Sequence, residues 1–205
     1  MERDRRVAHP VAQSMVETAR RLIGERGVAG TTTRGVELAT RGRRGQPLGP
    51  GSTFYYFGTK ERLLVEVLRV DLERRLALLR ARVRSVESLE DLLGALEEGV
   101  DAFAGENPAS HVLLCECVGA PLRHETLADA QAEGDRRWSA ELAGMLLELE
   151  QRGVVRVGAR AAVLADLFTA AAQGAGIHQV ADPEWDRRAV VAIISELLGA
   201  AALRA

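Results

Sequence analysis

The chain has 205 residues, 47% hydrophobic and 27% charged, which is typical of a soluble globular protein. No apolar run approaches the ~20 residues of a membrane-spanning helix, and no hydrophobic stretch follows the charged first residues, so neither a membrane protein nor a secretory signal peptide is expected. The net charge is −2, but residues 1–62 hold 12 of the 27 basic and only 6 of the 29 acidic side chains, a pattern typical of a polyanion-binding head on an acidic body.

Three helices are predicted in this basic third. Residues 1–10 lack hydrophobic periodicity and predict a flexible arm, which either touches DNA or has no role. Apolar residues at helical spacing predict a helix over residues 12–26 that ends at Gly27, a residue suited to the end of a helix. Shorter helices are expected over residues 33–41, with a threonine cap, and over residues 52–56.

Four consecutive aromatic residues, Phe54 to Phe57, are conspicuous in a chain that is 4% aromatic. Gly58 predicts a tight turn after them, and Lys60, the only lysine, falls at the start of the next helix. The first turn of a helix has free backbone N–H groups that favour an anion. The tyrosine hydroxyls and Lys60 therefore suit a phosphate backbone, whereas Phe54 and Phe57 are expected to fill a small core.

The rest of the chain is predicted to be a stack of helices. Pro and Gly residues mark their ends, and leucine-rich stripes mark their buried faces. The expected helices cover residues 59–83, 88–104, 107–119, 125–152 and 159–180, with a last helix starting at Asp182-Pro183.

The last two predicted helices suit a dimer interface. The 159–180 helix is rich in alanine and glycine, and the final helix is nearly apolar. Such a pair buries well against a second copy of itself, so a homodimer through a four-helix interface is expected. The alternative is that both helices complete the core of a monomer. The apolar residues of the final helix are Val190, Val191, Ile193, Ile194, Leu197 and Leu198.

Four motifs in order carry a family resemblance: Glu25-Arg26-Gly27, Thr31-Thr32-Thr33-Arg34, the run from Ser52 to Phe57, and the run from Gly58 to Leu64. With this spacing, residues 11–68 resemble the DNA-binding domain of the TetR family of bacterial transcriptional regulators. The resemblance implies an all-α fold of about nine helices. It places a three-helix helix-turn-helix domain in residues 1–58 and a ligand-binding and dimerisation domain in residues 59–205.

The function that this resemblance implies is a ligand-responsive DNA-binding regulator, a repressor released from a palindromic operator by a small-molecule inducer. The expected partners are double-stranded DNA, the inducer and a second copy of the chain, in the cytoplasm and without a cofactor. No H-E-x-x-H or G-x-S-x-G motif and no Gly-rich phosphate loop is present, so an enzyme is not expected.

One segment departs from the family pattern. Residues 40–51 take twelve positions where a helix-turn-helix uses a turn of 3–4 residues, and six of residues 42–51 are Gly or Pro. The insertion either brings Arg43 and Arg44 onto DNA or misplaces the following helix. In the second case, the chain would be a helical ligand-binding or protein-interaction module that has lost sequence-specific DNA binding.

The candidate DNA-binding residues have two origins. The resemblance implies phosphate contacts at Thr32, Tyr56 and Lys60. The other candidates are chosen because they lie near the predicted helices of this domain and carry a hydroxyl group or a positive charge. For each arginine the alternative is a solvated surface residue without a role in DNA binding. The added residues are Arg34, Arg43, Arg44, Ser52, Thr53 and Tyr55.

The candidate ligand-binding residues are mostly apolar and are spread over the helical body. For each of them the alternative is a place in the core, and Trp138 is favoured as a pocket residue because its N–H needs a partner. His111 and Cys115 are four residues apart, but without a third ligand no metal site is expected. The candidates are Phe103, His111, Cys115, Trp138, Leu142, Met145, Phe168 and Gln173.

Overall fold

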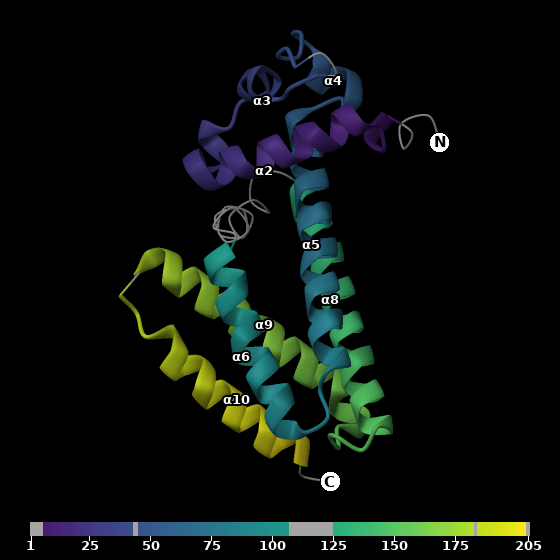
Figure 1. The fold of residues 1–205 in the computed structure, drawn as a ribbon, viewed down its shortest axis with the longest axis vertical. Coiled ribbons are helices and arrows are strands. Elements are labelled where there is room, and N and C mark those ends of the chain that lie inside the picture. The colour runs from purple at the N-terminus through teal and green to yellow at the C-terminus, as the bar shows by residue number, and fades with distance from the viewer. Residues whose placement is uncertain (1–5, 43–44, 107–124, 183, 204–205) are drawn as a thin grey trace. The chain divides into compact units, whose positions relative to one another are not determined.

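The structure is a computed structural model that describes residues 6–42, 45–106, 125–182 and 184–203. Across those ranges the chain forms eight α-helices, one short 3-10 helix and no strand, which confirms the predicted all-α class. In chain order they are α2 (Pro10–Gly30), α3 (Thr33–Ala39), α4 (Ser52–Tyr56), α5 (Lys60–Arg84), α6 (Leu89–Glu106), α8 (Glu125–Gln151), η2 (Gly158–Arg160), α9 (Ala161–Ala181) and α10 (Arg187–Leu203) (Figure 1).

Most helix ends lie within a few residues of the predicted ones. Gly27 has a φ of 70° and marks a kink at the predicted end, after which α2 continues to Gly30. The predicted start of the last helix at Asp182-Pro183 is wrong. Asp182 is the extended residue that ends α9, and α10 begins only after Asp186, whose carboxylate accepts a hydrogen bond from the Ala189 N–H at 3.1 Å. The predicted 107–119 helix lies outside the described residues.

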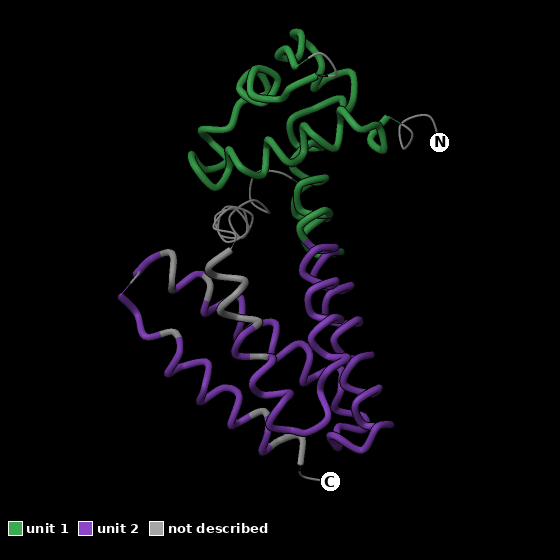
Figure 2. The backbone as a smooth tube through the Cα atoms, viewed as in Figure 1, with its two compact units in different colours: residues 1–71, 108–133 green, residues 72–107, 134–205 purple. Residues whose placement is uncertain are grey.

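The chain packs as two compact units (Figure 2). Unit 1 comprises residues 1–71 and 108–133, and unit 2 comprises residues 72–107 and 134–205. These units are defined by packing, whereas the expected boundary after residue 58 divides the chain by function. That functional division stays a prediction.

The core of unit 1 is organised around α2. The predicted apolar stripe of this helix is buried and packs with Val36 of α3, with Phe57 and with the first two turns of α5. Burying this face removes apolar surface from water, and it gives the short helices α3 and α4 a support that their own length does not supply. The buried residues of α2 are Ala12, Met15, Val16, Ala19, Leu22 and Ile23.

The core of unit 2 joins α5, α6, α8 and α9 through buried leucine, valine and methionine side chains. Polar side chains near the end of α8 hold the segments that follow α5 and α8. Arg152 donates to the carbonyl oxygen of Val83, in the last turn of α5, and to that of Val86, just beyond this helix. Glu150 accepts hydrogen bonds from the N–H groups of Val157 and Gly158, at 2.9 and 3.0 Å. Glu150 and Arg152, at the C-terminal end of α8, therefore hold both the segment after α5 and the turn that leads to η2.

The start of α6 yields a pH-dependent prediction. Asp91 accepts hydrogen bonds from the N–H groups of Glu87 and Ser88, and its own N–H donates to the Ser88 hydroxyl. The bond from Glu87, and then the contact with the Ser88 side chain, hold the pKa of the Asp91 carboxyl below its ordinary 3.8. A lowered folded-state pKa contributes stability that is present above the unfolded-state pKa and is lost as the pH falls through the folded-state value.

We therefore expect the difference in Tm between the wild type and Asp91→Asn to narrow as the pH falls from about 6 to about 3, because the charged cap is lost from the wild type alone. Thermal unfolding followed by circular dichroism across this range measures it. A Tm difference that does not change with pH would contradict the assignment.

Candidate functional site

The inserted segment between α3 and α4 folds back on itself. Arg41 and Pro47 form an isolated antiparallel bridge, and the Gly42 N–H donates to the carbonyl oxygen of Gln46 at 2.8 Å. Gly45 has a φ of 72°, a conformation that favours glycine, and its N–H donates back to the Gly42 carbonyl oxygen at 2.9 Å. Because the segment leaves and returns at one place, α3 and α4 remain packed against each other despite the added residues.

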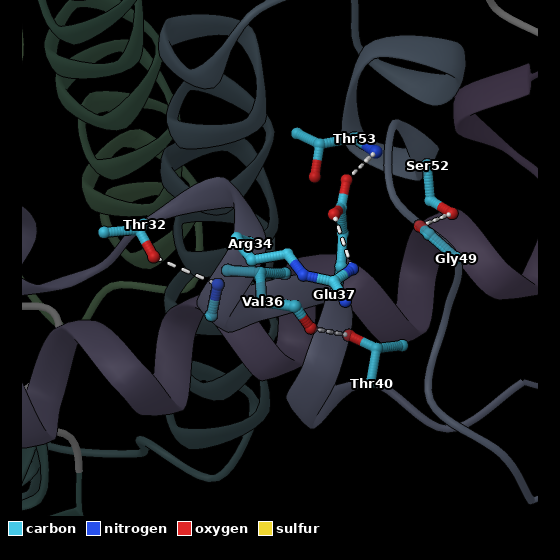
Figure 3. A network of polar contacts seen from close by, with 9 residues as sticks. Thr32, Arg34, Val36, Glu37, Thr40, Gly49, Ser52 and Thr53 are labelled. Atoms are coloured by element: carbon cyan, nitrogen blue, oxygen red, sulfur yellow. Dashed lines mark hydrogen bonds and ion pairs between the residues drawn. The ribbon is translucent and has the colours of Figure 1, made fainter.

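A buried glutamate joins the two helices (Figure 3). The backbone oxygen of Glu37 in α3 accepts from the N–H of Leu48, where the inserted segment returns, at 3.0 Å. Its carboxylate accepts from the N–H of Thr53 in α4, also at 3.0 Å. Sequence reasoning did not identify Glu37. Its only signal was a charged residue between the apolar positions of a short helix.

The aromatic run divides between core and surface. Phe57 is only 2% exposed and lies in the core of unit 1, as predicted. The same prediction is wrong for Phe54, which is 61% exposed. Thr53 in α4 and Phe57, the residue after this helix, are four residues apart and are both buried. Phe54 is one residue after Thr53, so its side chain is turned about 100° around the helix, away from the buried side.

The two tyrosines have different surroundings. Tyr55 is exposed, and the guanidinium of Arg6 lies 5.0 Å from the centre of its ring. Tyr56 is half-buried, its ring stacks on that of His9 with a centroid separation of 5.5 Å, and its hydroxyl lies 3.5 Å from His9 Nδ1. Tyr55 and Tyr56 also meet edge to face at 4.9 Å. The end of the N-terminal arm therefore packs against α4.

This ordered contact corrects the prediction of a flexible arm for residues 6–10. His9 is the residue before α2, and its Nδ1 accepts a hydrogen bond from the Val11 N–H at 3.2 Å. Pro10 at the first helical position was the available signal, because proline is favoured there. Residues 1–5 lie outside the described part of the chain.

The remaining candidate DNA-binding residues lie at helix ends in unit 1. Thr32 is exposed, and its hydroxyl oxygen accepts from the Gly35 N–H at 3.0 Å as the cap of α3. Lys60 is half-buried, and its Nζ donates to the carbonyl oxygen of Val28 at 2.9 Å. Arg34 is exposed and approaches the Glu37 carboxylate at 3.5 Å.

The hydroxyls of Ser52 and Thr53 differ in access. Ser52 is half-buried and donates to the carbonyl oxygen of Gly49 at 2.8 Å. Thr53 is fully buried, so the expectation that its hydroxyl reaches DNA is wrong. Thr53 and Phe57 are four residues apart, about one helical turn, and both side chains therefore point into the core. Arg43 and Arg44 lie outside the described residues.

Several candidate ligand-binding residues meet in unit 2. Leu142 and Met145 are buried, and Trp138 and Phe168 are half-buried against the same cluster. Gln173 of α9 donates to the carboxylate of Asp135 in α8 at 3.1 Å. His111 and Cys115 lie outside the described residues, as does the side chain of Phe103 in α6.

Two charged residues that sequence reasoning missed adjoin these candidates. The guanidinium of Arg75 lies 5.6 Å from the centre of the Trp138 ring, and Asp135 binds Gln173. Asp135 stands three residues before Trp138 on α8, so helical spacing was the available signal. Within the described ranges, no three His, Cys, Asp or Glu side chains gather as ligands for a metal ion. None of the described helices combines the length and apolar character needed to cross a membrane.

The chain resembles a known protein family in sequence and solved structures in fold. Residues 88–202, more than half of the chain, match the family model of the BetI-type transcriptional repressor, C-terminal domain. None of the curated proteins matches the chain in sequence.

Solved structures share the fold at low sequence identity. Salmonella enterica GusR is 19% identical with a TM-score of 0.72, covering 94% of this chain and 95% of its own. FadR from Bacillus subtilis in complex with stearoyl-CoA is 15% identical with a TM-score of 0.71, covering 93% and 98%. Reduced Escherichia coli NemR is 16% identical with a TM-score of 0.74, covering 92% and 96%.

Proposed function

The chain belongs to the TetR family of transcriptional regulators, and from this premise we propose that it is a ligand-responsive repressor, released from a palindromic operator by a small molecule. Family membership makes it a regulator rather than an enzyme. We place its action in the cytoplasm, where its DNA target lies.

The observation that carries the proposal is the closure of residues 40–51. The bridge between Arg41 and Pro47 returns the chain to the end of α3, and Glu37 then bonds to α4. The added residues therefore do not separate the two helices of the helix-turn-helix. A protein whose α4 had been displaced would instead suit the alternative of a ligand-binding module without sequence-specific DNA binding.

The exposed side chains of α4 support its role as the helix that enters the major groove, called the recognition helix below. Phe54 offers an apolar surface of the kind that contacts a thymine methyl group, and the Tyr55 hydroxyl can reach a phosphate. Thr32, Tyr56 and Lys60 are proposed to bind phosphates beside the groove. Arg34, Arg43, Arg44 and Ser52 remain proposed contacts, whereas the buried Thr53 is not proposed as one.

Selection of bound fragments from random duplex DNA tests this function. We expect the selected fragments to share a near-palindromic sequence whose half-sites lie about one helical turn of DNA apart, because a two-fold dimer presents two recognition helices. Retention that depends on salt but not on sequence would overturn it and would favour the ligand-binding module.

We expect Lys60→Ala to weaken operator binding and to lower the slope of log affinity against log salt concentration by about 1, because one phosphate contact is lost. Gel shifts over a series of salt concentrations measure both effects. Lys60→Gln is the matched control that separates the loss of charge from the loss of the hydrogen bond to Val28, since its amide can still donate to the Val28 carbonyl but carries no charge. If Lys60→Ala leaves the salt slope unchanged, Lys60 does not bind a phosphate.

We propose that the second copy of the chain binds to an apolar face formed by α9 and α10. Each helix carries one stripe of exposed apolar and small residues. The residues of a stripe are alternately three and four positions apart in the sequence, which is the spacing by which two helices pack side by side. The opposite side of α10 packs on α6, where Gly199 faces Leu93. The two stripes are Val163, Leu167, Ala170, Gly174 and Ile177 on α9, and Val190, Ile193, Leu197 and Ala200 on α10.

The inducer is proposed to bind in unit 2 near Trp138, Leu142, Met145 and Phe168, with Gln173 as a polar contact. Phe103, His111 and Cys115 stay in the proposed set. A mostly apolar surface with few polar groups suits an amphipathic small molecule. FadR from Bacillus subtilis, which shares the fold, is in complex with stearoyl-CoA, and that supports a ligand with a long apolar part.

A further inference from the structure

We infer that Glu37 is a positioning residue for the recognition helix, and that its buried carboxylate caps α4 from the neighbouring helix α3. This inference rests on the proposed function, because it assigns to α4 the reading of DNA.

Helix α4 cannot hold its own start. It has five residues, and helices this short are unstable alone. Its first N–H groups have no partner within the helix and normally bond to the side chain of the preceding residue. Here that residue is Gly51, which has no side chain, adopts a φ of 86° and makes no capping hydrogen bond.

Glu37 supplies the missing acceptor from sixteen residues away. Its carboxylate oxygen Oε1 accepts from the N–H of Thr53, the second residue of α4, at 3.0 Å. The side chain is only 4% exposed, so the bond is shielded from competing water. A negative charge at the start of a helix is also favoured by the helix dipole.

The same residue also holds the end of the inserted segment. The backbone oxygen of Glu37 accepts from the Leu48 N–H, and Arg34 approaches the other carboxylate oxygen at 3.5 Å. A buried carboxylate needs such a partner, because an unpaired charge in the core is costly. Glu37 therefore bonds both to Leu48, where the inserted segment returns, and to Thr53 in α4. Figure 3 shows its contacts with Thr53 and Arg34.

Two uncharged variants of similar length test this role. Glu37→Gln keeps an oxygen that can accept from Thr53, whereas Glu37→Met fills the same space without an acceptor. We expect Glu37→Met to lose about tenfold in affinity for the selected operator relative to random-sequence DNA, and Glu37→Gln to recover most of that loss. Binding of both variants to random-sequence DNA should match the wild type, because phosphate contacts are unchanged.

The amide of Thr53 provides a second measurement that needs no DNA. In NMR spectra of the full chain, its proton should move upfield and exchange faster in Glu37→Met than in Glu37→Gln. Thr40→Val is the matched control, since the buried Thr40 hydroxyl donates to the Val36 carbonyl within α3 and does not reach α4.

The outcomes separate this inference from the function on which it rests. If the wild type selects no DNA sequence, the proposed function fails, while the Thr53 amide still tests the cap. If the wild type selects an operator but Glu37→Met and Glu37→Gln bind it equally, or Thr40→Val loses as much specificity as Glu37→Met, the positioning role of Glu37 is overturned.

Discussion

A Phe57→Ala variant is expected to lose about 3–5 kcal/mol of the free energy of unfolding of unit 1, because truncating a buried phenylalanine removes apolar burial and leaves a cavity. Phe57 is 2% exposed and touches the core that α2 organises. Domains are stable by only about 5–15 kcal/mol, so this loss removes a large share of the free energy of unfolding of unit 1.

The matched control lies three residues earlier. Phe54 is 61% exposed, and Phe54→Ala is expected to cost less than about 0.5 kcal/mol, the range of ordinary surface substitutions. Its effect should appear in operator affinity, because the side chain that faces outward on α4 is lost. Equal destabilisation by the two variants would contradict the division of the aromatic run between core and surface.

The chain provides separate signals for its two units. Both tyrosines, Tyr55 and Tyr56, lie in unit 1, whereas both tryptophans, Trp138 and Trp185, lie in unit 2. Near-ultraviolet circular dichroism in the tyrosine and tryptophan bands can therefore follow denaturant unfolding of each unit. Phe57→Ala should move the tyrosine midpoint further than the tryptophan midpoint.

The second large effect is expected at the proposed dimer interface. Leu197 is 66% exposed at the centre of the α10 stripe. In a two-fold interface one substitution acts twice, and burying two unpaired carboxylates costs several kcal/mol. We expect Leu197→Asp to raise the Kd of dimerisation by more than about 100-fold. Operator binding should fall with it, because a single recognition helix reads one half-site.

Sedimentation at micromolar concentration measures the oligomeric state of each variant. Leu78→Asp is the control, because Leu78 is an exposed leucine of α5 in the same unit but outside the two stripes. A wild-type chain that sediments as a monomer would reject the dimer, and dissociation by Leu78→Asp but not by Leu197→Asp would place the interface elsewhere.

Features that depend on residues close together in the sequence could be predicted, whereas features that depend on the path of the chain could not. The helices of the described ranges and most of their ends were predictable, since apolar spacing, Gly27 and a threonine cap act within a few residues. The start of α10 was missed because two aspartates, Asp182 and Asp186, each suited a cap, and only the path of the chain after α9 distinguishes them.

The all-α class, the basic first third and the run of aromatic residues on a short helix could all be predicted from the sequence. Three features became visible only in the folded chain: Phe54 is exposed, His9 stacks on Tyr56, and Glu37 reaches the start of α4. Helical period and capping depend on neighbours along the chain, whereas these contacts join residues that become neighbours only when α2, α3 and α4 pack. The free energy that selects such contacts comes from the packed core, and no short window of sequence contains it.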